Sequence, residues 1–212
     1  YIGMKCGIMD QAISANGTKD HLLRIDCKSY ELTQVAVPQN LVILIINSNI
    51  KHQLVGSEYN DRRESCEKAA KIMGVDLLRD ATIEQLEQFK SQMDDETYRR
   101  ARHVITEDER VLEASAAFEK GDLDTLAKLM YQSHVSMKDD FEITVKETDA
   151  LVDIVKNTLG EQKAAVRQTG GGFGGCVVAV VEPLNVQKVK DAVNAQYKAV
   201  SGIDATIFET TA

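Results

Sequence analysis

The stretch Thr169-Gly170-Gly171-Gly172-Phe173-Gly174-Gly175-Cys176 holds five of the thirteen glycines of the chain and lies between two apolar, strand-like runs. Backbone without side chains can approach a phosphate closely and point its N–H groups at it. Gly170, Gly172 and Gly175 match the fingerprint G-x-G-x-x-G, but that fingerprint must open a helix, and a strand-like run follows here. A Walker A loop is excluded because no Gly-Lys-Ser/Thr closes it. The alternative is a tight β-hairpin whose glycines merely supply positive φ angles.

The region around this turn has the order strand, turn, strand, helix, strand. Apolar runs predict strands at 164–169, 176–181 and 203–208, and apolar positions at helical spacing predict a helix at 186–200. On an antiparallel or mixed sheet this order is an α+β arrangement of the split-βαβ kind.

Upstream of the turn, the pattern predicts strands followed by several helices. Alternating residues at 23–27 indicate a strand with one solvent-exposed face, and a second strand is expected at 32–37, ended by Pro38. The apolar run 41–46 indicates a central strand covered on both faces. Apolar stripes predict helices that end near Gly74, Gly121 and Gly160, and Thr82 with Gln85 forms a capping box that opens another. The expected helical stripes lie at 66–73, 82–89, 111–118, 123–130 and 151–159.

The bulk composition excludes several classes of protein. With 212 residues, 43% hydrophobic and 27% charged, the chain is that of an ordinary soluble globular protein. A net charge of -8 and the absence of a basic stripe argue against a nucleic-acid partner. The longest apolar runs are far short of the roughly 18 residues that span a bilayer, so we expect no membrane segment. Nothing at the N-terminus resembles a signal peptide.

The cysteines and histidines are scattered, without a C-x-x-C pair or an H-E-x-x-H motif. The sequence therefore predicts reduced thiols in a cytoplasmic protein and no metal site on these residues. The residues concerned are Cys6, Cys27, Cys66, Cys176, His21, His52, His103 and His134.

Three polar stretches could carry chemistry or could be structural. Asp10 follows a glycine and precedes a short amphipathic run, so it is a candidate carboxylate, or simply a helix N-cap. The stretch 56–63 could be only a capped, solvated helix start. The stretch 133–141 mixes hydroxyl, imidazole and carboxylate groups, but linear spacing cannot establish a triad, and we assign no role to His134, Asp139 or Asp140.

Together these stretches show a resemblance to a known family. Cys-Gly-Ile-Met-Asp-Gln at 6–11, Gly-Ser-Glu-Tyr-Asn-x-Arg-Arg at 56–63, Ser-His-x-Ser-Met-Lys-Asp-Asp at 133–140 and the glycine stretch occur in the order found in galactokinases. The chain resembles the C-terminal part of bacterial members of this branch of the GHMP family of small-molecule kinases, over essentially all 212 residues. The first and last motifs together are specific, whereas the glycine loop alone marks only the wider family.

The resemblance implies a fold and a reaction. The expected fold is α+β: residues 1–38 would end an N-terminal α/β domain, and residues 39–212 would form a split-βαβ-like domain with added helices. The implied reaction transfers the γ-phosphate of ATP, with Mg²⁺, to the anomeric hydroxyl of α-D-galactose, giving galactose 1-phosphate. A loose transition state needs positioning and charge stabilisation, so one carboxylate on the attacking hydroxyl suffices.

The resemblance also implies roles for individual residues. Asp10 matches the active-site aspartate that accepts or orients the proton of the sugar hydroxyl. Gly7 matches a backbone contact to galactose, and Tyr59 matches a tyrosine that binds a sugar hydroxyl. The loop from Gly170 to Gly175 matches the motif that shapes the substrate and phosphate pocket. We expect these elements to meet in the cleft between the two domains.

The departures from the family pattern matter as well. The sugar-binding first motif and the phosphate-binding second motif have no counterpart here, and the chain begins at Tyr1 without an initiator Met. We interpret the chain as a piece of a longer protein, with most ligands of ATP and Mg²⁺ upstream, and expect it to be inactive alone. The alternatives are a kinase for a related sugar such as N-acetylgalactosamine or galacturonate, a galactose-sensing regulatory homologue, or an acidic α+β interaction domain. The sequence does not predict the oligomeric state.

Overall fold

The computed structural model describes residues 7–50, 56–160 and 163–210, with the backbone alone for 56–59. Its strands are β1 (His21–Ile25), β2 (Leu32–Ala36), β3 (Val42–Asn47), β4 (Ala165–Thr169), β5 (Cys176–Val181) and β6 (Thr206–Thr210). Its α-helices are α1 (Met9–Asn16), α2 (Gly56–Met73), α3 (Ile83–Phe89), α4 (Asp95–Lys120), α5 (Leu123–Asp139), α6 (Lys146–Leu159) and α7 (Val186–Ser201). Short 3-10 turns are η1 (Leu78–Asp80), η2 (Lys90–Gln92) and η3 (Pro183–Asn185).

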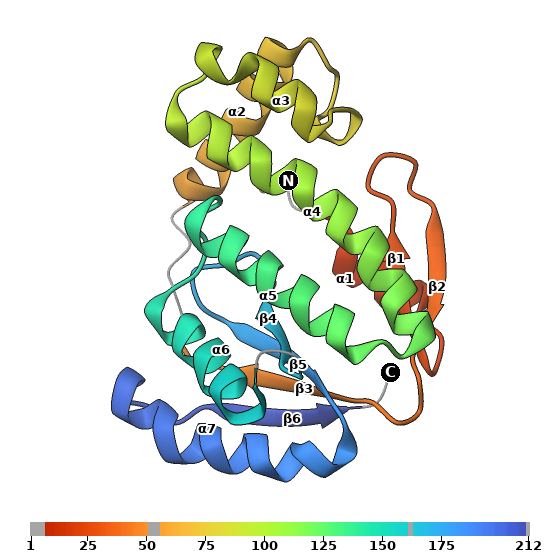
Figure 1. Ribbon diagram of the computed structural model, residues 1–212, viewed down its shortest axis with the longest axis vertical. Helices are drawn as coiled ribbons and strands as arrows, with labels where there is room; N and C mark the ends of the chain where they lie inside the picture. Colours follow the sequence, from red (N-terminus) through yellow and green to blue (C-terminus); the bar gives the residue numbers. More distant parts are fainter. Residues whose placement is uncertain (1–6, 51–55, 161–162, 211–212) are drawn as a thin grey trace.

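The main sheet has the strand order β4-β5-β3-β6, and all its pairs are antiparallel. The sequence places β3 far from its partners, yet Ile45 pairs with Val178 on one side and with Phe208 on the other. The order β4, β5, α7, β6 confirms the predicted α+β arrangement and the central position of β3. Helices α6 and α7 lie side by side against this sheet (Figure 1).

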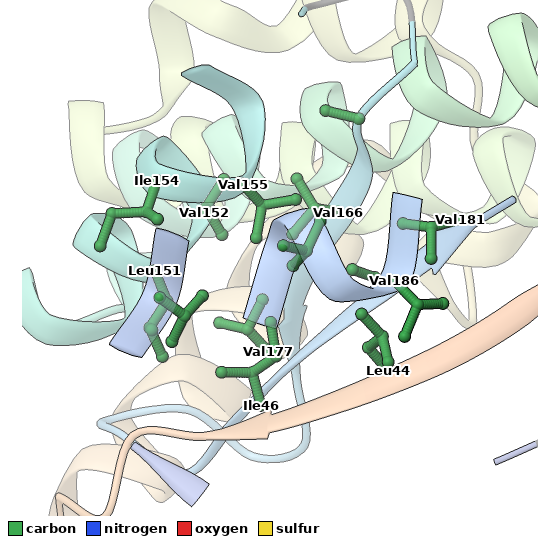
Figure 2. Close-up of a cluster of buried hydrophobic side chains, with 14 of the residues drawn as sticks. Leu44, Ile46, Leu151, Val152, Ile154, Val155, Val166, Val177, Val181 and Val186 are labelled. Carbon is green, nitrogen blue, oxygen red and sulfur yellow. The ribbon is translucent and has the colours of Figure 1, made fainter. Parts of the chain in front are cut away.

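The largest core fills the space between the sheet and these two helices (Figure 2). Side chains alternate along β3, so that Leu44 and Ile46 are fully buried while Ile43 and Ile45 on the other face are half-buried. The cover that the sequence predicted on both faces of β3 is therefore complete on one face and only partial on the other. Burying a Leu or Ile side chain contributes about 1.5–3 kcal/mol, so this face anchors the sheet. Its partners include Leu151, Val152, Val155, Val177, Val186, Val189 and Val193.

The hairpin of β1 and β2 forms a separate two-stranded sheet that packs on α4 and α5. Val35 and Val37 join Phe118 and Leu126 in this second core. The predicted strand at 23–27 ends earlier, at Ile25, because the carboxylate of Asp26 accepts the backbone N–H groups of Lys28 and Ser29 and closes a turn.

The last strand also differs from its prediction. β6 spans Thr206–Thr210 rather than 203–208. Gly202 adopts a left-handed conformation with φ of 78° after α7, and the hydroxyl of Ser201 hydrogen-bonds the backbone of Ile203. These contacts make Ile203 part of the turn that ends α7, so β6 begins only at Thr206.

Helix α4 is much longer than the stripe at 111–118 indicated, because it begins at Asp95 and runs for 26 residues. Its first half packs on α2 and α3 in a third core that includes Ala69, Leu86 and Tyr98. Gly121 ends it with φ of 65°, as predicted, and the capping box of Thr82 and Gln85 is present at α3. No helix in the described ranges has the length and apolar character needed to cross a bilayer.

Candidate active site

The glycine stretch forms the tip of the β4–β5 hairpin, where Thr169 pairs with Cys176. Gly170, Gly172, Gly174 and Gly175 all have positive φ, and so does Phe173 at 58°. The hairpin alternative from the sequence is thus correct as a description of the backbone, and at Gly172 there is a steric reason for glycine as well. A Cβ on Gly172 would lie 2.6 Å from both the Cβ and the carbonyl oxygen of Ile143.

Two neighbouring segments hold the hairpin tip by its backbone. The N–H of Phe173 donates to the carbonyl of Ile143, at 2.5 Å, in the turn between α5 and α6. On the other side Gly175 accepts the N–H of Ser48, at 2.9 Å, just after β3. The tip is therefore fixed between the α5–α6 turn and the end of the central strand.

Helix α2 reaches the same place through Arg62, which is only 9% exposed. Its Nε donates to the carbonyl of Phe141 at 2.8 Å, and its Nη2 donates to the carbonyl of Glu142 at 2.5 Å. Its guanidinium also lies 4.7 Å from the centre of the Phe173 ring. Arg62 thus contacts both the α5–α6 turn and the hairpin.

A pocket of about 410 Å³ opens between α2 and the hairpin. Its walls combine two basic side chains with apolar and glycine surface, and its lining consists of Arg62, Arg63, Cys66, Phe141, Ile143, Gly170, Gly171 and Phe173. Among the described residues no hydrogen bond is made by the backbone N–H of Gly171. Burial raises the pKa of Cys66 to about 11, so its thiol is not a nucleophile at neutral pH.

Buried polar groups support the hairpin from beneath. Gln168, the residue before Thr169, is fully buried; its amide donates to the carbonyl of Ile143 at 3.1 Å and accepts from Thr148 at 2.5 Å. Its backbone N–H points at Nδ1 of His134 at 3.4 Å, and Nε2 of the same ring lies 3.3 Å from the carboxylate of Asp149. His134 thus lies between β4 and α6 and contacts both.

A second polar cluster ties α4 to α5 and β4. Glu107 accepts from Arg167 at 2.7 Å and from the hydroxyl of Ser133 at 2.5 Å, and it pairs with Arg110. Burial by itself would raise the pKa of Glu107, but Arg167 and the hydrogen bonds from Ser133 and Arg110 lower it. The carboxylate is thus charged at neutral pH and fixes Arg167 on the sheet.

His103 on α4 stacks on Phe141, with ring centroids 4.5 Å apart, and so supports the turn that Arg62 contacts. Ser136 donates its hydroxyl proton to Asp140, so it must accept from Nδ1 of His103, 3.0 Å away. Burial lowers the pKa of His103 from 6.5 to about 4, with smaller opposing contributions from nearby acidic and basic groups. The ring is neutral in the folded protein near pH 7.

This lowered pKa predicts a pH dependence of stability. Between the two pKa values the unfolded chain takes up a proton that the folded His103 does not, so stability is complete above pH 6.5 and falls towards pH 4. Lowering the pH from about 7.5 to about 5 should remove about 1–2 kcal/mol through this group. We expect His103→Gln to lose less stability than the wild type over this interval in urea unfolding. Equal losses in the two proteins would contradict the assignment.

Outside the glycine loop, the site residues predicted from the sequence lie in two helices or next to them. Gly7 is exposed just before α1, and Asp10 is exposed in its first turn. The N-cap of α1 is Ile8, so the interpretation of Asp10 as a capping residue is wrong. Tyr59 lies in α2, three residues before Arg62, and its side chain is outside the described part of the structure.

The structure brings two of the three predicted site elements together. Arg62 links α2, which carries Tyr59, directly to the glycine hairpin. Helix α1 lies against β1 and, in the view of Figure 1, on the opposite side of α5 from the hairpin. No hydrogen bond or ion pair among the described residues joins Asp10 to the hairpin. The meeting of Asp10 with the other elements at one substrate stays a prediction.

Part of the chain matches a known protein family. Residues 114–199, which include the hairpin, match the family described as GHMP kinases C terminal. This part of the chain is similar to the C-terminal domain of the GHMP kinases. This result confirms the resemblance found in the sequence and the expected fold.

Solved structures extend the similarity to the whole chain. The crystal structure of Lactococcus lactis galactokinase complexed with galactose matches 100% of this chain at 31% identity and a TM-score of 0.90, and the chain spans 57% of that protein. L. major mevalonate kinase in complex with R-mevalonate matches 90% of the chain at 18% identity and a TM-score of 0.56, over 48% of its own length. Streptococcus pneumoniae phosphomevalonate kinase in complex with phosphomevalonate and AMPPNP matches 86% at 9% identity and a TM-score of 0.53, over 43% of its length. The last two similarities show the fold alone.

The described ranges contain no group of three or more His, Cys, Asp or Glu side chains that could hold a metal ion. We assign none of these residues to the Mg²⁺ that the resemblance implies.

Proposed function

We propose that this chain is part of a galactokinase, which transfers a phosphoryl group from ATP to the anomeric hydroxyl of galactose. The observation that carries the proposal is the match of the whole chain, at 31% identity, to a galactokinase that was solved with galactose bound. ATP is proposed as the phosphoryl donor because the matching domain belongs to a kinase family.

The residues of this chain would act mainly by positioning. Phosphoryl transfer passes through a loose transition state, in which placing the attacking hydroxyl contributes more than a strong nucleophile does. Asp10, exposed in the first turn of α1, would accept or orient the proton of the sugar hydroxyl. Tyr59 would bind a second hydroxyl, and Gly7 would contact the sugar through its backbone.

The glycine hairpin would form the wall of the substrate and phosphate pocket. Its tip is held rigidly on both sides, so the N–H of Gly171 would meet an oxygen of the substrate without first losing conformational freedom. Arg62 and Arg63 supply positive charge on the opposite wall, next to the place where negative charge moves during transfer.

The direct test is a coupled assay of galactose-dependent ADP release, on the protein expressed from its complete reading frame. We expect turnover with galactose that exceeds turnover with N-acetylgalactosamine, galacturonate and mevalonate at least about tenfold, because one hydrogen-bonded hydroxyl can discriminate by such factors. Preference for another sugar would identify a related sugar kinase. Galactose binding without ADP release would identify a regulatory homologue, and neither result is compatible with the proposal.

A further inference from the structure

We infer that Arg62 is a positioning residue that holds the glycine hairpin at a fixed position relative to helix α2. This inference rests on the proposed function where it concerns turnover, and on the geometry alone where it concerns the hairpin. Arg62 is buried, and its guanidinium reaches two carbonyls of the α5–α6 turn and the ring of Phe173 at once.

Arg62, the α5–α6 turn and Phe173 at the hairpin tip each contact the other two. Arg62 donates to Phe141 and Glu142, and the next residue, Ile143, accepts the N–H of Phe173. The ring of that same Phe173 lies under the guanidinium, at a distance typical of a cation–π contact. A shift of the hairpin relative to α2 would break contacts on both sides of the guanidinium.

The position of Arg62 in its helix gives these contacts a consequence for the site. Arg62 follows Tyr59 by three residues in α2, which is less than one turn of the helix. Fixing Arg62 to the hairpin fixes the spacing between the helix that carries Tyr59 and the glycine wall of the pocket. Under the proposed function, that spacing would set the width of the space for the sugar.

The chemistry requires arginine at this position. A guanidinium presents several N–H donors in a fixed plane and can serve two carbonyls while its face rests on a ring. A lysine ammonium at Arg62 would reach one carbonyl and lose the planar contact. Neighbouring Arg63 also lines the pocket, but it is exposed and pairs with Glu67 four residues on, so it adds positive charge to the wall without holding the hairpin.

The test compares Arg62→Ala and Arg62→Lys with Arg79→Ala, a control that removes a guanidinium from η1 and its ion pair with Asp26. In hydrogen-exchange mass spectrometry of the protein from the complete reading frame, we expect exchange at 170–176 to be at least about tenfold faster in Arg62→Ala. Arg62→Lys should lie between the wild type and Arg62→Ala. Arg79→Ala should match the wild type in this segment.

Activity provides the second readout. We expect kcat with galactose to fall at least about tenfold in Arg62→Ala, with a smaller change in KM, because the hairpin would be misplaced in the transition state. Millimolar guanidinium should restore part of kcat in Arg62→Ala and none in Arg62→Lys, whose side chain occupies the space. General loss of stability would show no such rescue.

The outcomes separate this inference from the proposed function. A wild-type protein that does not phosphorylate galactose overturns the function, while hydrogen exchange still decides the role of Arg62. Unchanged exchange at 170–176 in Arg62→Ala overturns the positioning role, even if galactose is turned over. If Arg62→Ala does not fold, Arg62→Lys and Phe173→Leu are compared in the same two measurements; unchanged exchange and kcat in both overturn it.

Discussion

Replacement of Asp10 by Asn is expected to lower kcat for galactose phosphorylation by on the order of 100-fold or more, because positioned proton transfer contributes factors of this size. Asn keeps the size of the side chain but accepts no proton. Asp10 is exposed in the first turn of α1, where nothing in the described structure uses it as a cap. Binding of ATP should change little, since the carboxylate is proposed to serve the sugar hydroxyl. The assay is galactose-dependent ADP release, with nucleotide affinity measured separately.

A matched control separates catalysis from helix stability. Asp124 occupies the same position in α5 as Asp10 does in α1, the second residue of the helix, and it is also exposed. An acidic residue in a first turn stabilises the helix dipole by about 0.3–1 kcal/mol. Asp124→Asn should lose this small contribution and keep full turnover. If Asp10→Asn behaves like Asp124→Asn, the carboxylate of Asp10 has only a helix-stabilising role.

The features that the sequence predicted well depend on local chemistry. The glycine turn between two apolar runs, the capping box at Thr82 and the left-handed end at Gly121 all follow from residues within a few positions of one another. Such effects are contained in a short stretch of sequence, because they arise from allowed φ angles and from nearby backbone donors.

The features that it missed depend on contacts made across the fold. The first half of α4 has many charged residues, and only packing on α2 and α3 reveals which side of it is buried. Arg62 and Arg63 look alike in the sequence, yet one is buried against carbonyls that lie 79 and 80 positions away, while the other is exposed. Linear spacing does not contain this difference.

The candidate site shows the same division. Motif resemblance indicated Asp10, Tyr59 and the glycine loop as site elements, and their roles stay predictions. The structure shows the loop as the tip of a hairpin and joins it to α2 through Arg62. The supporting roles of Gln168 and Ile143 had no signal in the sequence, because each acts through a single amide or carbonyl group. The division of the chain near residue 38 remains a prediction.

The glycine hairpin should tolerate an added methyl group at one position and not at its neighbour. Gly172→Ala would place a Cβ 2.6 Å from two atoms of Ile143, on a backbone with φ of 93° that alanine rarely adopts. Because one of these atoms is a backbone carbonyl oxygen, no change of side-chain rotamer can relieve the contact. We expect the free energy of unfolding to fall by on the order of 2 to 4 kcal/mol, from strain and overpacking together.

Gly171→Ala is the matched comparison, since a Cβ there meets no atom within 4 Å and its φ is not in the left-handed region. Its free energy of unfolding should stay within about 0.5 kcal/mol of the wild type in urea titration, as is usual for a surface substitution. Gly172→Ala should also lose the slow exchange of the Phe173 amide, because the clash pushes the hairpin away from the Ile143 carbonyl. Two variants of equal stability and equal exchange would show that the hairpin does not press on the α5–α6 turn. In that case the α5–α6 turn would not restrain the hairpin, and Arg62 could not position the hairpin through its hydrogen bonds to that turn.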